Sequence, residues 1–242
     1  MTRSARHVTL TPGYLLHHHP WRDTSRILEV LTREHGRLSL FARGVRGPKA
    51  KLAPVLQPFQ PLLLSWSGRG EAPQLTGAER AAPAAPLPQT CLLAGFYLNE
   101  LLLKLTTRHD ALPELFDHYH ATLGQLRGGA PLEPALRVFE KRLLEVLGYG
   151  LDLVTEARSG LPLEADAYYD FQPGVGLVAA PGSGAPALRG QSLLSLARES
   201  LQGERTLEDA RRVLKAALGA CLEGRPLATR LVARAMKRGA SA

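Results

Sequence analysis

Positively charged side chains recur in the first third of the chain at the spacing of an exposed strand and its loop. Arg37 and Arg43 fall on one face of a predicted strand and Leu38 and Leu40 on the other, because side chains alternate along a strand. The loop 44–51 that follows carries three cations, no acidic residue, and Gly and Pro residues that oppose packing. Cations presented in this way are suited to contacts with phosphate groups.

We therefore expect an anionic polymer to be bound through the cations of this stretch and of the strand before it. The loop residues Arg46, Lys49 and Lys51 are the preferred contacts. The full set of candidates is Arg22, Arg26, Arg33, Arg37, Arg43, Arg46, Lys49, Lys51 and Arg69.

Aromatic side chains in the same region could stack on bases. Trp21, Phe41 and Trp66 are the candidates, although residues of this type more often fill a core or a barrel end. Phe41 is favoured because it alternates with arginines on one strand.

The charge of the chain is unevenly distributed. The 242 residues carry a net charge of +8. Residues 1–82 hold 12 Lys and Arg against 5 Asp and Glu, residues 83–202 hold 9 against 13, and residues 203–242 hold 9 against 4. Positive charge concentrated at the two ends of the sequence is more typical of binding surfaces for a polyanion than of a uniform solubilising coat.

Several chemistries are disfavoured by the residue types. Cys91 and Cys221 are the only cysteines and both lie in apolar helical patterns, which excludes a disulfide framework or a cysteine-rich zinc site. No phosphate-binding glycine loop of the nucleotide hydrolases occurs. We therefore predict no catalytic residues and no cofactor.

Two polar clusters were weighed as metal or acid–base sites. Among the three consecutive histidines only His17 and His19 share a strand face, and nothing nearby completes a ligand shell. Glu164, Asp166 and Asp170 gather in a stretch rich in Gly and Pro, where a solvated loop is favoured over general acid–base catalysis. We predict no bound metal.

The elements that must position the cations follow from the patterning. Strands are predicted at 13–20, 26–32, 37–43, 58–66 and 72–78, and five short strands with basic loops indicate a Greek-key barrel of the oligonucleotide-binding type. Beyond the Pro- and Ala-rich segment 81–88 the apolar period becomes helical.

The fold class is therefore α+β, with a five-stranded oligonucleotide-binding (OB-fold) barrel followed by a mostly helical domain. We expect the barrel domain at 1–80, the helical domain at 81–150 and 191–242, and a small irregular insertion at 151–190.

Several separated blocks resemble the RecO family of bacterial recombination mediators and DNA repair proteins. They are PWRDTSRILEVLTREHGRLSLFARGVRG, LQPFQPLLLSWSGRGE, YLNELLLKL, EPALRVFEKRLLEVLGYG and GRPLATRLVARAM, in the order of the family. The resemblance implies a non-enzymatic protein that binds single- and double-stranded DNA and anneals complementary strands. It also implies action with RecR and RecF to help RecA replace single-stranded DNA-binding protein.

The resemblance carries two further expectations for the helical region. The acidic, Phe-ended tail of single-stranded DNA-binding protein is expected to dock there, with Arg137 and Lys141 beside an apolar pocket. Some family members carry a four-cysteine zinc module after the GYG block, but residues 151–190 contain no cysteine, so packing and hydrogen bonds must hold this segment.

Two other functions stay open at this point, an RNA-binding barrel protein and a metal-dependent nuclease. We expect the protein in the cytoplasm, associated with the nucleoid, because no apolar run approaches the roughly 18 residues of a membrane span.

Overall fold

The computed structural model describes residues 7–46, 50–180 and 187–239. Its secondary structure is mixed, with a five-stranded barrel followed by helices and a small sheet, which confirms the α+β prediction. The chain forms two compact units. The first comprises Met1–Gly128 and Leu227–Ala242, and the second comprises Gly129–Pro226. The division predicted from the sequence has three parts instead of two, namely 1–80, 81–150 with 191–242, and 151–190. It stays a prediction.

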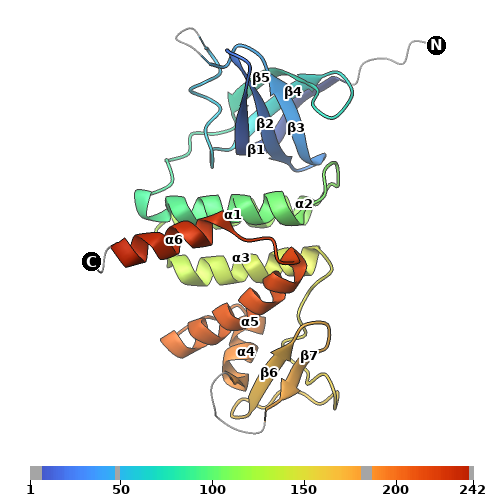
Figure 1. The fold of residues 1–242 in the computed structure, drawn as a ribbon, viewed down its shortest axis with the longest axis vertical. Coiled ribbons are helices and arrows are strands. Elements are labelled where there is room, and N and C mark those ends of the chain that lie inside the picture. Colours follow the sequence, from blue (N-terminus) through green and yellow to red (C-terminus); the bar gives the residue numbers. More distant parts are fainter. Residues whose placement is uncertain (1–6, 47–49, 181–186, 240–242) are drawn as a thin grey trace, which may run out of the picture. The chain divides into compact units, whose positions relative to one another are not determined.

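The first element of the first unit is a closed β-barrel (Figure 1). Its strands are β1 (His7–Trp21), β2 (Ser25–Thr32), β3 (Gly36–Ala42), β4 (Leu62–Ser67) and β5 (Gln74–Arg80). They join in the order β1-β2-β3-β5-β4, and only the β3–β5 contact is parallel, at Phe41 and Gln74. Residues 7–12, which the patterning did not place in a strand, belong to β1 because its first half pairs with β4 and its second half with β2.

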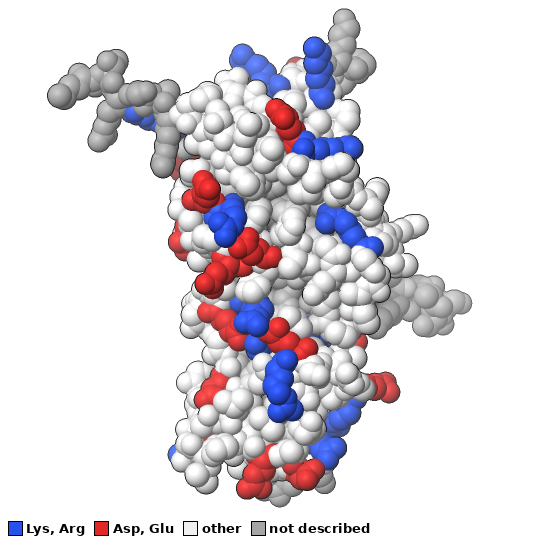
Figure 2. Space-filling model, turned by 180° about the vertical axis from the view of Figure 1, so that it is seen from behind, with Lys and Arg blue, Asp and Glu red and all other residues white. Residues whose placement is uncertain are grey.

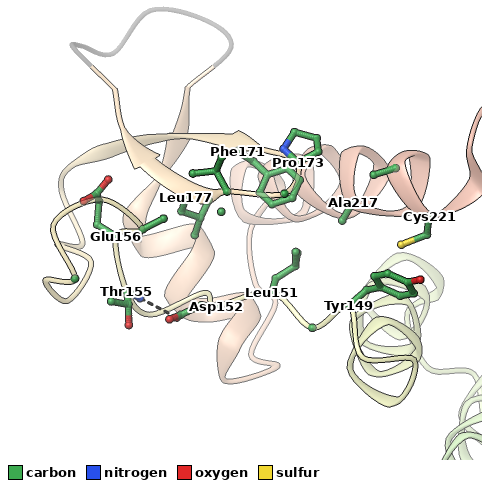
Figure 3. Close-up of a pocket in the computed structure, with 17 residues that line it drawn as sticks. Tyr149, Leu151, Asp152, Thr155, Glu156, Phe171, Pro173, Leu177, Ala217 and Cys221 are labelled. Atoms are coloured by element: carbon green, nitrogen blue, oxygen red, sulfur yellow. Dashed lines mark hydrogen bonds between the residues drawn. The ribbon is translucent and has the colours of Figure 1, made fainter.

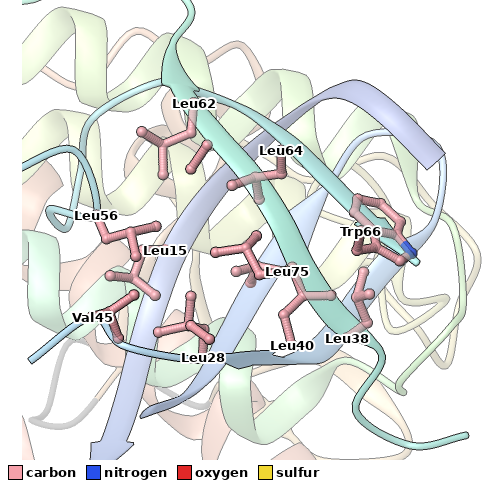
Figure 4. Close-up of a cluster of buried hydrophobic side chains, with 13 residues drawn as sticks. Leu15, Leu28, Leu38, Leu40, Val45, Leu56, Leu62, Leu64, Trp66 and Leu75 are labelled. Atoms are coloured by element: carbon pink, nitrogen blue, oxygen red, sulfur yellow. The ribbon is translucent and has the colours of Figure 1, made fainter. Parts of the chain in front are cut away.

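The barrel interior is filled by aliphatic side chains from all five strands (Figure 4). Leu28, Leu40 and Leu64 are fully buried, as the alternating pattern requires. Trp66 is only 5% exposed and belongs to this core, so it is not available for stacking on a base. With the interior apolar, the charged side chains of the strands are directed outward or to the barrel ends.

Helices complete the first unit. They are η1 (Gln89–Cys91), α1 (Leu92–Leu105), α2 (Pro113–Arg127) and α6 (Ala228–Gly239). A buried polar chain fixes α1 and α2 to the barrel, because Asn99 donates to the Leu16 carbonyl at 2.8 Å and accepts from the Tyr119 hydroxyl at 2.6 Å. The segment 81–88 packs within this unit, since Leu87 is 6% exposed and Arg127 donates to the Ala85 carbonyl.

The final helix is held on α1 by a carboxylate. Glu100 of α1 accepts hydrogen bonds from the backbone N–H groups of Ala228 and Thr229 at 2.8 and 3.0 Å. These two groups belong to the first turn of α6 and have no partner within that helix. Arg230 adds a hydrogen bond to the Tyr97 hydroxyl at 3.1 Å. The helix α6 is thereby fixed to residues 128 to 133 positions earlier in the chain.

A second buried network lies where the barrel meets the α1–α2 connection. The Glu29 carboxylate accepts from the Ser39 hydroxyl at 2.6 Å, from Arg37 at 3.0 Å and from Arg108 at 2.5 Å. Arg37 also donates to the Thr106 carbonyl at 2.8 Å. Burial alone raises the pKa of Glu29, but the hydrogen bonds from Ser39 and Arg108 and the charge of Arg37 outweigh it and keep the pKa below its usual value.

The second unit contains helices and a small sheet. Its elements are α3 (Leu132–Val146), β6 (Tyr168–Gln172), β7 (Gly176–Ala179), β8 (Leu188–Arg189), α4 (Gly190–Ala197) and α5 (Glu204–Leu222). The sheet has the order β7-β6-β8, and β6 and β7 form a hairpin from Tyr169–Ala179 to Gln172–Gly176. The insertion at 151–190 therefore contains regular structure as well as turns.

A carboxylate organises the turns of this insertion. Glu156 accepts from the backbone N–H groups of Arg158 and Ser159 through one oxygen and from that of Ala179 in β7 through the other. These hydrogen bonds lower the pKa of Glu156 from 4.5 to about 2. The hydroxyl and the N–H of Ser159 contribute most, and the N–H groups of Arg158 and Ala179 contribute less. The Glu156 carboxylate thus joins this turn to the hairpin.

The Glu29 network predicts a large loss of stability on Glu29→Gln. The substitution leaves Arg37 without its charged partner, and we expect the free energy of unfolding in urea to fall by about 3 kcal/mol. The matched control is Glu79→Gln at an exposed position of β5, which should stay within about 0.5 kcal/mol. Equal stability of the two variants would show that the network contributes little.

The lowered pKa of Glu156 predicts an acid-dependent contribution to stability. Because the folded-state pKa is depressed, the contribution is complete above the usual value of 4.5 and is lost as the pH falls toward about 2. Glu156→Gln should therefore lower the thermal midpoint near neutral pH, and the difference from wild type should disappear across this window. Glu164→Gln, at an exposed position of the same segment, is the control. A difference that does not change with pH would contradict the assignment.

Candidate nucleic-acid interface

Three segments meet at one end of the barrel. The β1–β2 turn ends at Thr24, just before β2 begins at Ser25. The backbone N–H of Arg46, which follows β3, donates to the Thr24 carbonyl at 3.0 Å. Phe41 donates its N–H to the Pro73 carbonyl in the β4–β5 connection at 2.9 Å. The β1–β2 turn, the residues after β3 and the β4–β5 connection therefore lie at the same end.

We call this region the barrel-end surface. It is defined by one aromatic residue and five arginines, namely Trp21, Arg22, Arg26, Arg43, Arg46 and Arg69. Arg26 is half-buried and the other four arginines are exposed, while the acidic residues of the same segments are Asp23 and Glu71. In Figure 2, Lys and Arg side chains predominate over the barrel end, with an acidic side chain among them, whereas acidic and basic side chains alternate over the helices. The surface has an excess of positive charge.

The turn that carries Arg22 is held in a defined conformation. Arg22 has a φ of 51°, which is unusual for a residue with a side chain, and its carbonyl accepts a hydrogen bond from the Arg46 guanidinium at 3.2 Å. The Arg46 side chain thus connects two of the three segments. The backbone that carries Arg22 is thereby held in place, so little backbone entropy remains to be lost there on binding.

Arg33 and Arg37 lie at the opposite end of the barrel and are engaged in the fold. Arg33 forms two parallel hydrogen bonds with Asp117 of α2, at 3.0 and 2.9 Å, and Arg37 is bound to Glu29. Gly36 between them has a φ of 66°, and a Cβ there would lie 1.9 Å from the Asp110 carbonyl oxygen. The β2–β3 turn is therefore packed against the helices.

The remaining candidates of the loop are less closely defined. Lys51 is exposed at the start of a turn, and Lys49 lies outside the described residues. Among the aromatic candidates, Phe41 is half-buried within β3, whereas Trp21 at the end of β1 is 50% exposed. The patterning favoured Phe41, since alternation cannot show that the last residue of a strand extends past the core.

Arg137 and Lys141 occupy one face of α3 and are largely buried, with exposures of 7% and 8%. Arg137 pairs with Glu140 at 2.9 Å, and Lys141 pairs with Glu145 and Glu199, each at 2.9 Å. Burial raises the pKa of Glu199, but the hydrogen bonds from Lys141 and Arg142 outweigh it and lower the pKa overall. Both predicted docking residues thus already have carboxylate partners.

No metal centre is formed among the residues that the structure describes. The rings of His17 and His19 lie 4.4 Å apart, but no group of three or more His, Cys, Asp or Glu residues in the described ranges could hold an ion. Of the acidic cluster, Asp166 pairs with Arg189 at 2.8 Å. The described part of the chain also has no helix that is long and apolar enough to cross a membrane.

The second unit contains a groove of about 530 Å³ (Figure 3). Its walls are mostly apolar, with Phe171 and Leu177 from the hairpin and Ala217 and Cys221 from α5. The charged residues that line it are Asp152 and Glu156, whose carboxylates already accept backbone hydrogen bonds. The groove offers no converging polar groups for catalysis.

The comparison with known proteins agrees with this architecture. Residues 7–84 match the family described as recombination protein O N terminal, and residues 90–231 match the family described as recombination protein O C terminal. The first match covers the barrel and the second runs from η1 into α6.

Several curated relatives share most of the chain. A protein of Methylococcus capsulatus named DNA repair protein RecO is 44% identical over 223 residues, which is 92% of each chain. Proteins of the same name from Nitrosococcus oceani and Azoarcus sp. are 42% and 43% identical, and the matches cover 95% and 93% of those proteins. The chain belongs to the RecO family of recombination and DNA repair proteins.

Proposed function

We propose that this protein binds single- and double-stranded DNA through the barrel-end surface and anneals complementary strands. The observation that supports this most strongly is the convergence of five arginines from three segments on one barrel end. No bond is made or broken in this proposal, and the protein acts as a scaffold that neutralises charge.

The mechanism follows from electrostatics. Two strands approach against the mutual repulsion of their phosphates, and arginines that bind phosphate release counterions and reduce this repulsion. Contacts to phosphate leave the base edges free to pair, and they carry no sequence information. The same surface can therefore serve any pair of complementary strands.

The nine candidate cations contribute unequally to this surface. Arg22, Arg26, Arg43, Arg46 and Arg69 make the main contacts, and Lys49 and Lys51 extend them along the adjoining loop. Arg33 and Arg37 would have to leave Asp117 and Glu29 before reaching a phosphate, so we assign them a smaller contribution.

Family membership supports a role beyond annealing. We propose that the protein acts with RecR and RecF to help RecA replace single-stranded DNA-binding protein on gapped DNA, as the family resemblance implies. Such a role places the protein on the nucleoid in the cytoplasm.

Docking of the acidic, Phe-ended tail of single-stranded DNA-binding protein is proposed at α3. A tail carboxylate would bind Lys141 or Arg137 in place of an internal partner. Glu199 is the natural group to be displaced, because it binds Lys141 at 2.9 Å and Arg142 at 2.5 Å from outside α3. In the absence of the tail, the positive charges that would bind it are thus paired with carboxylates of this protein.

The barrel-end surface predicts the effect of replacing Arg22, Arg43 and Arg46 together by Ala. DNA affinity should fall at least roughly tenfold at low salt, equally for unrelated sequences, because phosphate contacts are lost. The slope of log affinity against log salt for single strands should decrease by about 2, at about 0.7 for each contact. Fluorescence anisotropy with labelled oligonucleotides measures both quantities.

The matched control removes the same charge elsewhere. Arg158, Arg198 and Lys215 are exposed cations of the second unit, and their joint replacement by Ala should change affinity less than threefold, a modest change in general electrostatics. Equal losses for the two triple variants would show that net charge alone determines binding, and the barrel-end surface would then be discarded.

The docking proposal predicts opposite effects of two changes at one contact. Lys141→Ala should weaken binding of a peptide with the acidic tail sequence, whereas Glu199→Gln should strengthen it severalfold because a competing carboxylate is removed. Calorimetric titration measures both affinities, with Lys215→Ala in α5 as control. If neither variant differs from wild type, the tail binds elsewhere.

A further inference from the structure

The two tryptophans have different environments. Trp66 is 5% exposed in the barrel core, whereas Trp21, the last residue of β1, is 50% exposed. Half of the largest apolar side chain in the barrel-end surface is therefore in contact with solvent. Burial of that remaining surface would be favourable, so the indole is available for a planar apolar partner.

The position of Trp21 is set by the ordered turn around it. Trp21 pairs with Ser25 across β1 and β2, and the next residue, Arg22, has a φ of 51°. The Arg46 guanidinium holds the Arg22 carbonyl at 3.2 Å, and Arg26 pairs with Pro20 on the neighbouring strand. Trp21 is therefore next to Arg22 in a turn whose backbone is held by Arg46, and it lies opposite the start of β2, which carries Arg26.

We infer that Trp21 stacks on an unpaired base of the strand whose phosphates the arginines bind. The inference rests on the proposed function and specifies its ligand as single-stranded nucleic acid with exposed bases. A protein partner of purely apolar character fits less well, because docking there would bury several arginines without a charged partner. Stacking on a base satisfies both features, since the base covers the indole and the adjoining phosphates pair with the guanidinium groups.

Stacking also gives the surface a means of distinguishing substrate from product. Bases in a single strand are available to the indole, whereas bases in a duplex are stacked on one another. Trp21 therefore adds affinity only before annealing, and this contact is lost once the strands have paired. The duplex is then held by phosphate contacts alone.

The experiment compares three DNA ligands of equal length: oligothymidylate, an abasic strand with the same phosphates, and a duplex. Trp21→Leu keeps an apolar side chain without an aromatic face, and Trp21→Phe restores such a face. We expect Trp21→Leu to bind oligothymidylate about tenfold more weakly and the abasic strand and duplex within twofold of wild type. Trp21→Phe should recover most of the loss, and the salt slope should stay unchanged because no phosphate contact is removed.

Intrinsic fluorescence provides an independent measurement. Oligothymidylate should quench the tryptophan emission of wild type, and the abasic strand should not. The quenching should be absent in Trp21→Phe, in which the buried Trp66 is the only tryptophan. Thermal unfolding of the variants checks that they fold, and Trp21→Phe keeps the test decisive if Trp21→Leu is unstable.

The outcomes separate the inference from the proposed function. If wild type binds none of the three ligands, the proposed function fails. A second outcome is that wild type binds all three DNA ligands with a salt slope that depends on the arginines, and that Trp21→Leu has the same relative affinities for the three ligands as wild type. In that case only the stacking of Trp21 is overturned. Equal losses of affinity of Trp21→Leu for oligothymidylate and for the abasic strand would likewise overturn stacking. If oligothymidylate does not quench the emission of wild type, the exposed indole would instead be assigned to contact with a protein partner.

Discussion

The structure of the first unit depends on the buried carboxylate of Glu29. A charge at 6% exposure is tolerable only when it is fully paired, and Ser39, Arg37 and Arg108 supply the partners. Because Arg108 lies between α1 and α2, pairing it with the barrel closes one barrel end with helices. The Glu29 network thus holds the α1–α2 connection against one end of the barrel, and the arginines of the barrel-end surface lie at the other.

Much of this arrangement could be predicted from local patterns. The alternation of residues 37–43 predicted β3 and its buried face, and the shift from a period of two to a helical period predicted where the barrel ends. What could not be predicted are pairs distant in sequence. Arg33 looked like a phosphate contact because its partner Asp117 lies 84 residues away, and Arg137 looked exposed because amphipathic periodicity does not show that a charged position is covered. Such pairs form only when the elements meet.

The second unit shows how hydrogen bonds to one carboxylate can join separate segments of a small insertion. Glu156 accepts three backbone N–H groups from two separate segments, so one carboxylate performs the connecting role that a metal ion has in cysteine-rich modules. The difference lies in the conditions that each tolerates. A chelator removes a metal but not a carboxylate, while acid neutralises the carboxylate.

The hydrogen bonds between Glu100 and the first turn of α6 have a consequence for biosynthesis. The groups that bind Glu100 are translated 128 and 129 residues after it, when all of the second unit has already been synthesised. Until then α1 lacks the helix that packs on it, so the first unit matures last although its barrel is made first. A nascent chain that stalls within the second unit would expose this surface of α1, which is a signal that chaperones and proteases can recognise.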